Sequence, residues 1–182
     1  MSKPHDKLKM VQHSQIDPAK IDGLIANLNS SDGLVRHKAR NALVRIGEPA
    51  IEPLIKAWDS RDDYSHWQVA KALSLIGNAK SVQVLIETLK DDDFGIRWIA
   101  AEGLITVGRA GLESLLQALV NQADSVRLRE GAHHVIHDLI SRELLPKEAR
   151  QAILPVFAAL EDVAPTVTVP IAAHEALRAF KE

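Results

Sequence analysis

Residues 35–47 read VRHKARNALVRIG, and variants of this stretch recur at residues 69–77 (VAKALSLIG) and 96–108 (IRWIAAEGLITVG). A second apolar phrase precedes each copy, and four such phrases begin at Ile21, Ile51, Val82 and Leu112. These starts are separated by 30, 31 and 30 residues. A fixed period of this length is the signature of a repeat protein whose units stack into a solenoid.

Within each stretch the apolar residues recur at intervals of three and four, which is the spacing of one face of an α-helix. Residues 35–47 and the two later copies of this stretch each end in a glycine, namely Gly47, Gly77 or Gly108. Glycine adopts the positive φ of a helix C-terminus at little cost, so we expect a helix to end at each of these positions. The sequence therefore predicts an all-α chain of paired helices.

The first helix-start signal is Asp17-Pro18, because aspartate caps helix N-termini and proline suits the first helical position. We expect a polar, frayed leader at residues 1–16 and a single repeat domain at residues 17–182. The expected units are residues 17–50, 51–80, 81–110, 111–152 and 153–182.

The fourth unit is longer than the others. Its second helix fits best with a core stripe, which we predict to be Leu128, Ala132, Val135, Ile136 and Leu139. A competing register starting at Val126-Arg127 would bury charged and imidazole side chains, which is costly. The unit exceeds the period by about 11 residues, which we place in a surface insertion around 141–146.

Composition limits the function classes. Hydrophobic residues make up 46% of the chain but aromatics only 4%, which suits close-packed helices. The 22 Lys and Arg residues against 24 Asp and Glu residues give no basic excess, which argues against a nucleic-acid partner. Cysteine is absent, and neither a signal-peptide pattern nor a membrane-spanning run is present. We therefore predict a cytoplasmic protein without a membrane partner.

With these motifs, residues 18–182 resemble the HEAT-like repeat family in its short bacterial form, which is also found in phycobilisome-linked bilin lyases. The resemblance implies a right-handed α-α superhelix of about five helical hairpins, with the second helices lining the concave side. It also implies that Arg36 and Arg97 pair with aspartates of the preceding turns. His66 replaces the equivalent arginine in the second unit and is expected to interrupt this ladder.

Positions 37, 41 and 44 point away from the core stripe of the second helix. Carried along the repeats, the first column is His37, Trp67, Trp98, Glu130 and Ile171. The second column is Asn41, Lys71, Glu102, His134 and Glu175. The third column is Val44, Ser74, Ile105, His137 and Arg178.

Two tryptophans thus fall at equivalent, exposed positions of adjacent repeats, where large aromatics are typical of binding surfaces. The predicted binding groove consists of His37, Asn41, Trp67, Lys71, Trp98 and Glu102. The alternative is that Trp67 and Trp98 lean sideways and seal the seam between helices. Trp58 lies in line with apolar residues of the first helices and is expected in the core.

The histidine-rich stretch 133–137 raises the question of a metal. Glu130, His134 and His137 share one helix face in the preferred register, with Glu175 one repeat along, and such a set could hold zinc or iron. Solvated polar residues at the rim of a groove explain the pattern more simply. We therefore predict neither a metal nor a cofactor.

No nucleophile elbow, phosphate-binding loop or dinucleotide fingerprint is present in the sequence. The leading hypothesis is a non-catalytic module that binds another protein or an extended peptide along its concave face. One alternative is a subunit resembling a bilin lyase or isomerase, which holds a tetrapyrrole in an aromatic groove. The other is a binder of nucleic acid or damaged bases that resembles HEAT-like DNA glycosylases, with Trp67 and Trp98 stacking on bases.

Overall fold

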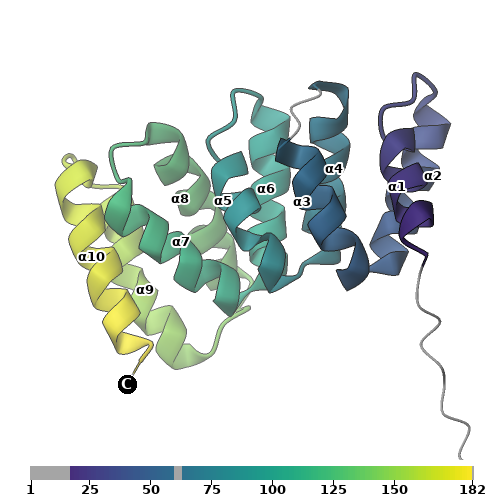
Figure 1. Ribbon diagram of the computed structural model, residues 1–182. Coiled ribbons are helices and arrows are strands. Elements are labelled where there is room, and N and C mark those ends of the chain that lie inside the picture. The colour runs from purple at the N-terminus through teal and green to yellow at the C-terminus, as the bar shows by residue number, and fades with distance from the viewer. Residues whose placement is uncertain (1–16, 60–62, 182) are drawn as a thin grey trace, which may run out of the picture.

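The computed structural model describes residues 17–59 and 63–181, and for residues 63–65 it describes the backbone only. The expected leader at residues 1–16 lies outside this part of the chain. The described residues form ten α-helices and no strand, which confirms the predicted all-α solenoid (Figure 1). The helices are α1 (Pro18–Asn27), α2 (Gly33–Ile46), α3 (Ile51–Asp59), α4 (Asp63–Ile76), α5 (Val82–Thr88), α6 (Phe94–Val107), α7 (Arg109–Asn121), α8 (Val126–Ser141), α9 (Lys147–Leu160) and α10 (Pro165–Ala179).

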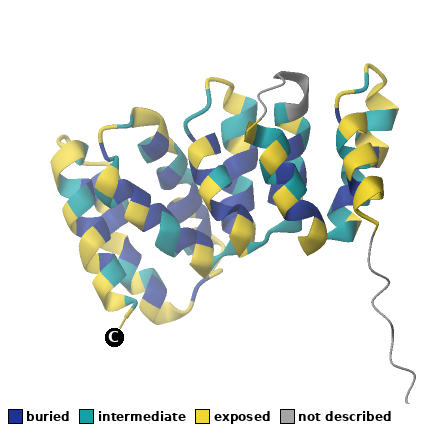
Figure 2. Ribbon diagram, in the orientation of Figure 1, coloured by how far each residue is buried: buried dark blue, intermediate teal, exposed yellow. Residues whose placement is uncertain are grey.

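The helices form two layers. One layer holds α1, α3, α5 and α7, and the other holds α2, α4, α6 and α8 (Figure 1). In the second of these layers each helix packs against its equivalent in the next unit. We call the two layers the first-helix layer and the second-helix layer. Their facing sides bury a continuous core that runs from Ile21 to Ala176 (Figure 2). Each unit thus buries its apolar stripe only by stacking on its neighbours.

Local signals set the helix ends. Asp17 and Asp32 cap α1 and α2, and each carboxylate accepts a hydrogen bond from the backbone N–H two residues later, at 3.0 and 2.8 Å. Gly47, Gly77 and Gly108 have φ of 73°, 62° and 71°, which confirms the predicted positive φ. At Gly47 and Gly108 the ψ angles of −133° and −131° lie outside the left-handed helical region, in territory that is close to exclusive to glycine.

The register predicted for α8 is confirmed. All five residues of its expected core stripe are buried, which are Leu128, Ala132, Val135, Ile136 and Leu139.

The arginine ladder differs from the expectation. Arg97 donates through Nη1 to the main-chain carbonyl oxygens of Asp91 and Asp92, at 2.9 Å each. Arg36 makes the equivalent pair of bonds to backbone carbonyls of the preceding turn. Arg97 thus bonds to the expected aspartates, but through their main-chain carbonyls, whereas Arg36 bonds to the carbonyls of Ser30 and Ser31, so the expected pairing with aspartate is wrong for Arg36. In both units the guanidinium group satisfies carbonyls of the turn that follows the first helix.

His66 continues the ladder instead of interrupting it. Its Nε2 lies 3.0 Å from the carbonyl oxygen of Trp58, and its ring stacks on the Trp58 indole with centroids 4.3 Å apart. Trp58 is half-buried and packs against the core. An imidazole is shorter than an arginine side chain, and it reaches the last turn of α3 directly.

The fifth hairpin is inverted relative to the expectation. α9 packs against α8 in the second-helix layer, and α10 packs against α7 in the first-helix layer (Figure 1). Arg109 at the start of α7 donates to the carbonyl oxygen of Phe180 just after α10, at 3.1 Å. The sequence-based placement of Ile171, Glu175 and Arg178 among the second helices is therefore wrong.

The turn between α8 and α9 explains this inversion. It lacks the glycine that ends the other second helices, and Glu143 takes the left-handed φ of 54° instead. The Glu143 and Leu144 N–H groups donate to the carbonyls of Ile140 and Leu139, which is a Schellman C-cap. This turn sends the chain straight back along α8. The expected surface insertion is a short turn that buries Leu145, and the expected unit boundary at 152/153 falls inside α9.

Candidate binding face

The predicted groove residues lie on α2, α4 and α6, on the side of the second-helix layer that faces away from the core. Trp67 and Trp98 are 39% and 47% exposed, and His37 is exposed. Asn41, Lys71 and Glu102 are half-buried beside them. We call the surface formed by these six residues and their α8 neighbours the second-helix face.

The Trp67 ring lies against the cationic side chain of Arg40. The guanidinium carbon of Arg40 lies 5.4 Å from the centroid of the Trp67 ring, and its Nη1 donates to Gln68 Oε1 at 2.5 Å. Arg40 Nε is buried and has no hydrogen-bond partner among the described residues. Burial lowers the pKa of Arg40 below its ordinary value, although an arginine stays charged in proteins. Arg40 was not among the predicted site residues, and its position on α2 brings it over Trp67 of the neighbouring repeat.

The Trp98 ring lies against the imidazole of His134. The rings of Trp98 and His134 have centroids 4.3 Å apart and planes tilted by 35°, and the ring centroid of Phe94 lies 6.2 Å from that of Trp98. A pocket of about 130 Å³ opens beside these rings and is lined further by Ala101 and Glu130. Phe94, which is 66% exposed, was not among the predicted site residues.

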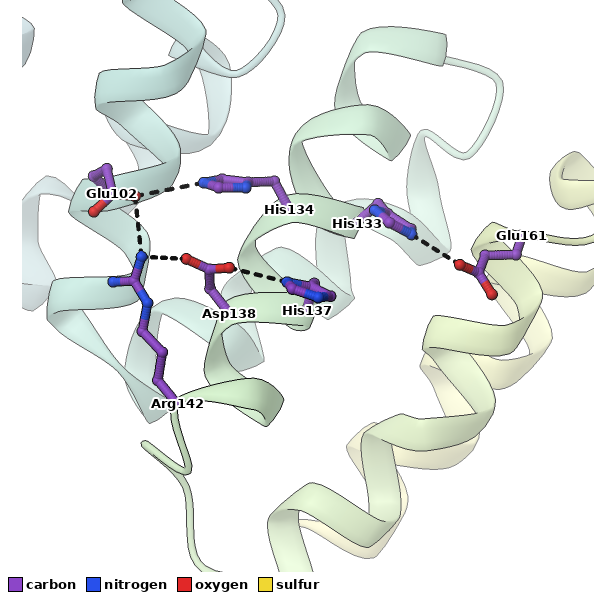
Figure 3. A network of polar contacts seen from close by, with 7 residues as sticks. All are labelled: Glu102, His133, His134, His137, Asp138, Arg142 and Glu161. Atoms are coloured by element: carbon purple, nitrogen blue, oxygen red, sulfur yellow. Dashed lines mark hydrogen bonds and ion pairs between the residues drawn. The ribbon is translucent and has the colours of Figure 1, made fainter.

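A polar network joins α6 to α8 (Figure 3) and includes His134, which lies against Trp98. His134 Nε2 lies 3.5 Å from Glu102 Oε1, and Arg142 Nη2 lies 2.5 Å from Asp138 Oδ2 and 3.9 Å from Glu102 Oε1. His137 Nδ1 lies 3.0 Å from Asp138 Oδ1. The network is thus built from two carboxylates, two imidazoles and one guanidinium.

Asp138 is the buried member of this network. Burial alone would raise the pKa of its carboxyl, but the hydrogen bond to His137 and the positive charge of Arg142 outweigh burial. The pKa of Asp138 therefore lies below its ordinary value. Asp138 is charged at neutral pH and binds Arg142 as an ion.

The metal-ligand set considered from the sequence does not assemble. Glu130 lines the pocket beside Trp98 and has no ligand atom in the cluster described next, and Glu175 lies on α10 in the other layer. The structure groups different residues: ligand atoms of Glu102, His134 and Asp138 lie within 4.8 Å of one another. The sequence columns missed Asp138 because they continued the α8 face through position 137.

The family model that describes HEAT repeats matches residues 21–105. This match supports a HEAT-like repeat family. None of the curated proteins matches it. HEAT repeats generally act as protein-interaction scaffolds. None of the described helices has the length and apolar character needed to cross a membrane.

The pocket on this HEAT-like chain bears on the tetrapyrrole alternative. Small-molecule sites usually enclose about 300–1,000 Å³, and the pocket beside Trp98 measures about 130 Å³. A bilin would therefore remain largely in solvent there.

Proposed function

We propose that this HEAT-like chain is a non-catalytic binding module that holds an extended segment of another protein against the second-helix face. The exposure of Trp67 and Trp98 at equivalent positions of α4 and α6 is the observation that carries the proposal. Large aromatics at such positions are costly to leave in water and dominate the binding energy of many interfaces.

The environment of the two indoles supports this role. Arg40 covers part of Trp67, and His134 lies against Trp98, so both rings are oriented before a partner arrives. A pre-oriented side chain loses less conformational entropy on binding than a free one. Further exposed apolar residues lie at the starts of the second helices, namely Leu34, Phe94 and Val126.

The charge of the second-helix face differs between its two ends, and this difference sets the chain direction in which a partner segment would bind. Arg40 and Lys71 flank Trp67, whereas Glu102 and Glu130 flank Trp98. Complementary charges fix the register of a partner more than they add affinity. We therefore expect an extended segment with acidic side chains beside α2 and α4, and basic side chains beside α6 and α8.

The experiment is capture of partners from a nuclease-treated lysate of the source cells, followed by measurement of the affinity for each captured protein after its purification. Trp67→Ala and Trp98→Ala should each weaken binding about 30-fold, which corresponds to about 2 kcal/mol. The matched control is Ile171→Ala, because Ile171 is 59% exposed but lies on α10 in the other layer.

The proposal is supported if the purified partner loses affinity for both tryptophan variants and keeps it for the control. It is overturned if the three variants bind the partner equally well. A ligand that disappears with nuclease, or a bilin whose visible spectrum changes on mixing, would also overturn it in favour of the corresponding alternative.

A further inference from the structure

His134 and Asp138 are four residues apart on α8, so both side chains project from the same helix face. Glu102 reaches them from α6, the preceding second helix. Ligand atoms of the three residues lie within 4.8 Å of one another (Figure 3). We propose that Glu102, His134 and Asp138 bind a divalent transition-metal ion of the zinc type. This inference does not depend on the proposed binding partner.

Two atoms of this cluster lack the partners that buried polar atoms normally have. Glu102 Oε1 and His134 Nε2 are both buried, and neither has a hydrogen-bond partner among the described residues. They lie 3.5 Å apart without the geometry of a hydrogen bond. Adjacent ligands of a tetrahedral zinc with bonds of about 2.0–2.1 Å lie about 3.3 Å apart. A metal ion between these two atoms would satisfy both.

The chemistry of the donors fits the same type of ion. One imidazole and two carboxylates form a mixed nitrogen and oxygen set that zinc accepts, whereas calcium and magnesium prefer oxygen ligands alone. Three protein ligands leave the fourth tetrahedral position open to water or to a side chain of a bound partner. His137 contacts the Asp138 carboxylate at 3.0 Å and would orient it as an outer partner.

Arg142 occupies the position of a competing cation. Its guanidinium lies 2.5 Å from Asp138 and 3.9 Å from Glu102, so it neutralises the carboxylates that the metal would bind. Arg142 follows the last turn of α8, and its side chain is 51% exposed. It can therefore swing into solvent when a divalent ion arrives. The structure thus predicts that removal of the Arg142 side chain strengthens metal binding.

The test is calorimetric titration of the full chain with Zn²⁺ at neutral pH. The wild type should bind one equivalent, and His134→Gln and Glu102→Gln should each weaken binding at least 10-fold. Arg142→Ala should strengthen it several-fold. The matched control is His133→Gln: His133 is on the same helix but contacts Glu161 at 3.2 Å, away from the cluster. Circular dichroism of each variant checks that the fold is retained.

A second readout uses Trp98, which lies against the proposed ligand His134. In a variant that carries only this tryptophan, with Trp58 and Trp67 replaced by Phe, Co²⁺ should quench the fluorescence, and addition of His134→Gln should abolish the effect. One-site binding that is lost in His134→Gln and kept in His133→Gln supports the proposal. Equal Zn²⁺ binding by these two variants, or absence of binding by both the wild type and Arg142→Ala, would overturn it.

Discussion

At the scale of single residues, the main feature is that Trp67 and Trp98 remain exposed while each lies against a polar group from a neighbouring helix. Arg40 reaches over Trp67 from α2, and His134 reaches Trp98 from α8. Cation–π and aromatic contacts of this kind contribute about 0.5–1.5 kcal/mol. They orient the indoles without removing them from solvent.

The first prediction concerns the stability of the tryptophan variants. Trp67→Ala and Trp98→Ala should lower the free energy of unfolding by less than the 3–5 kcal/mol typical of a buried tryptophan, because both rings lie outside the buried core. Chemical denaturation measures this loss. A loss as large as that of a core residue would mean that the rings seal the helix seam, as in the alternative interpretation.

The placement of a functional side chain could be predicted from the sequence only where the repeat makes positions equivalent. The period alone placed both tryptophans on the same face, because equivalent positions of a solenoid share their orientation. The contacts of Arg40 and Asp138 could not be predicted in this way. They depend on how far a flexible side chain reaches toward the next helix, and the sequence spacing does not encode that reach.

At the scale of the helix, glycine stabilises the fold at one position and destabilises it at another, relative to alanine. Gly47 ends α2 with a φ of 73°, and a Cβ built there meets nothing within 4 Å. Gly23 lies inside α1 at helical φ, also with open space around a Cβ. The two positions therefore separate backbone strain from steric contact.

We predict that Gly47→Ala lowers the free energy of unfolding by about 1–3 kcal/mol, the cost of forcing a side chain into this backbone region. Gly23→Ala should instead raise it by about 0.5–1 kcal/mol, because alanine is the better helix former. Thermal melts of the two variants give the comparison. Melting temperatures that shift in the same direction would contradict the assignment of Gly47 as a positive-φ terminator.

A pair of adjacent residues on α4 tests the orientation of the second helices. Ala72 is fully buried, and Lys71 is half-buried on the second-helix face. Ala72→Leu should destabilise the fold by about 1–3 kcal/mol through overpacking. Lys71→Leu should stay within about 0.5 kcal/mol of the wild type. Equal melting temperatures for the two variants would show that the helix faces are misassigned.

The order of the helices in the layers shows where sequence periodicity stops being informative. Periodicity predicted the helices and the glycines that end them, because both are local properties. It failed at α9 and α10, because either helix of the last hairpin can offer an apolar stripe to α8. The turn at Glu143 and the burial of Leu145 decide between the two arrangements, and these depend on tertiary packing.

At the scale of the whole molecule, the burial is uneven along the solenoid. α1 buries only Ile21, whereas α6, α7 and α8 each bury six residues. The inverted fifth hairpin contributes to this difference, because α9 covers α8 and α10 covers α7. The stability of a solenoid is a sum over units and their interfaces, so its weakly packed end opens first.

The rate of amide hydrogen exchange should therefore fall from the first unit toward the more deeply buried units. We expect the amides of α1 to exchange fastest among the helices and those of α7 and α8 to exchange slowest, because local opening requires less buried surface to be exposed at the first unit. Mass spectrometry of peptic fragments resolves this order. Uniform protection across all the helices would indicate that the solenoid unfolds as one cooperative unit.

Acrylamide quenching of single-tryptophan variants measures whether a polypeptide partner covers the second-helix face. In the free protein, variants that keep only Trp67 or only Trp98 should be quenched strongly, and the variant that keeps only the half-buried Trp58 should be quenched less. Saturation with the purified partner should lower the quenching of Trp67 and Trp98 several-fold and leave Trp58 unchanged. If Trp67 and Trp98 remain as accessible in the complex as in the free protein, the partner binds elsewhere and the account of the second-helix face is wrong.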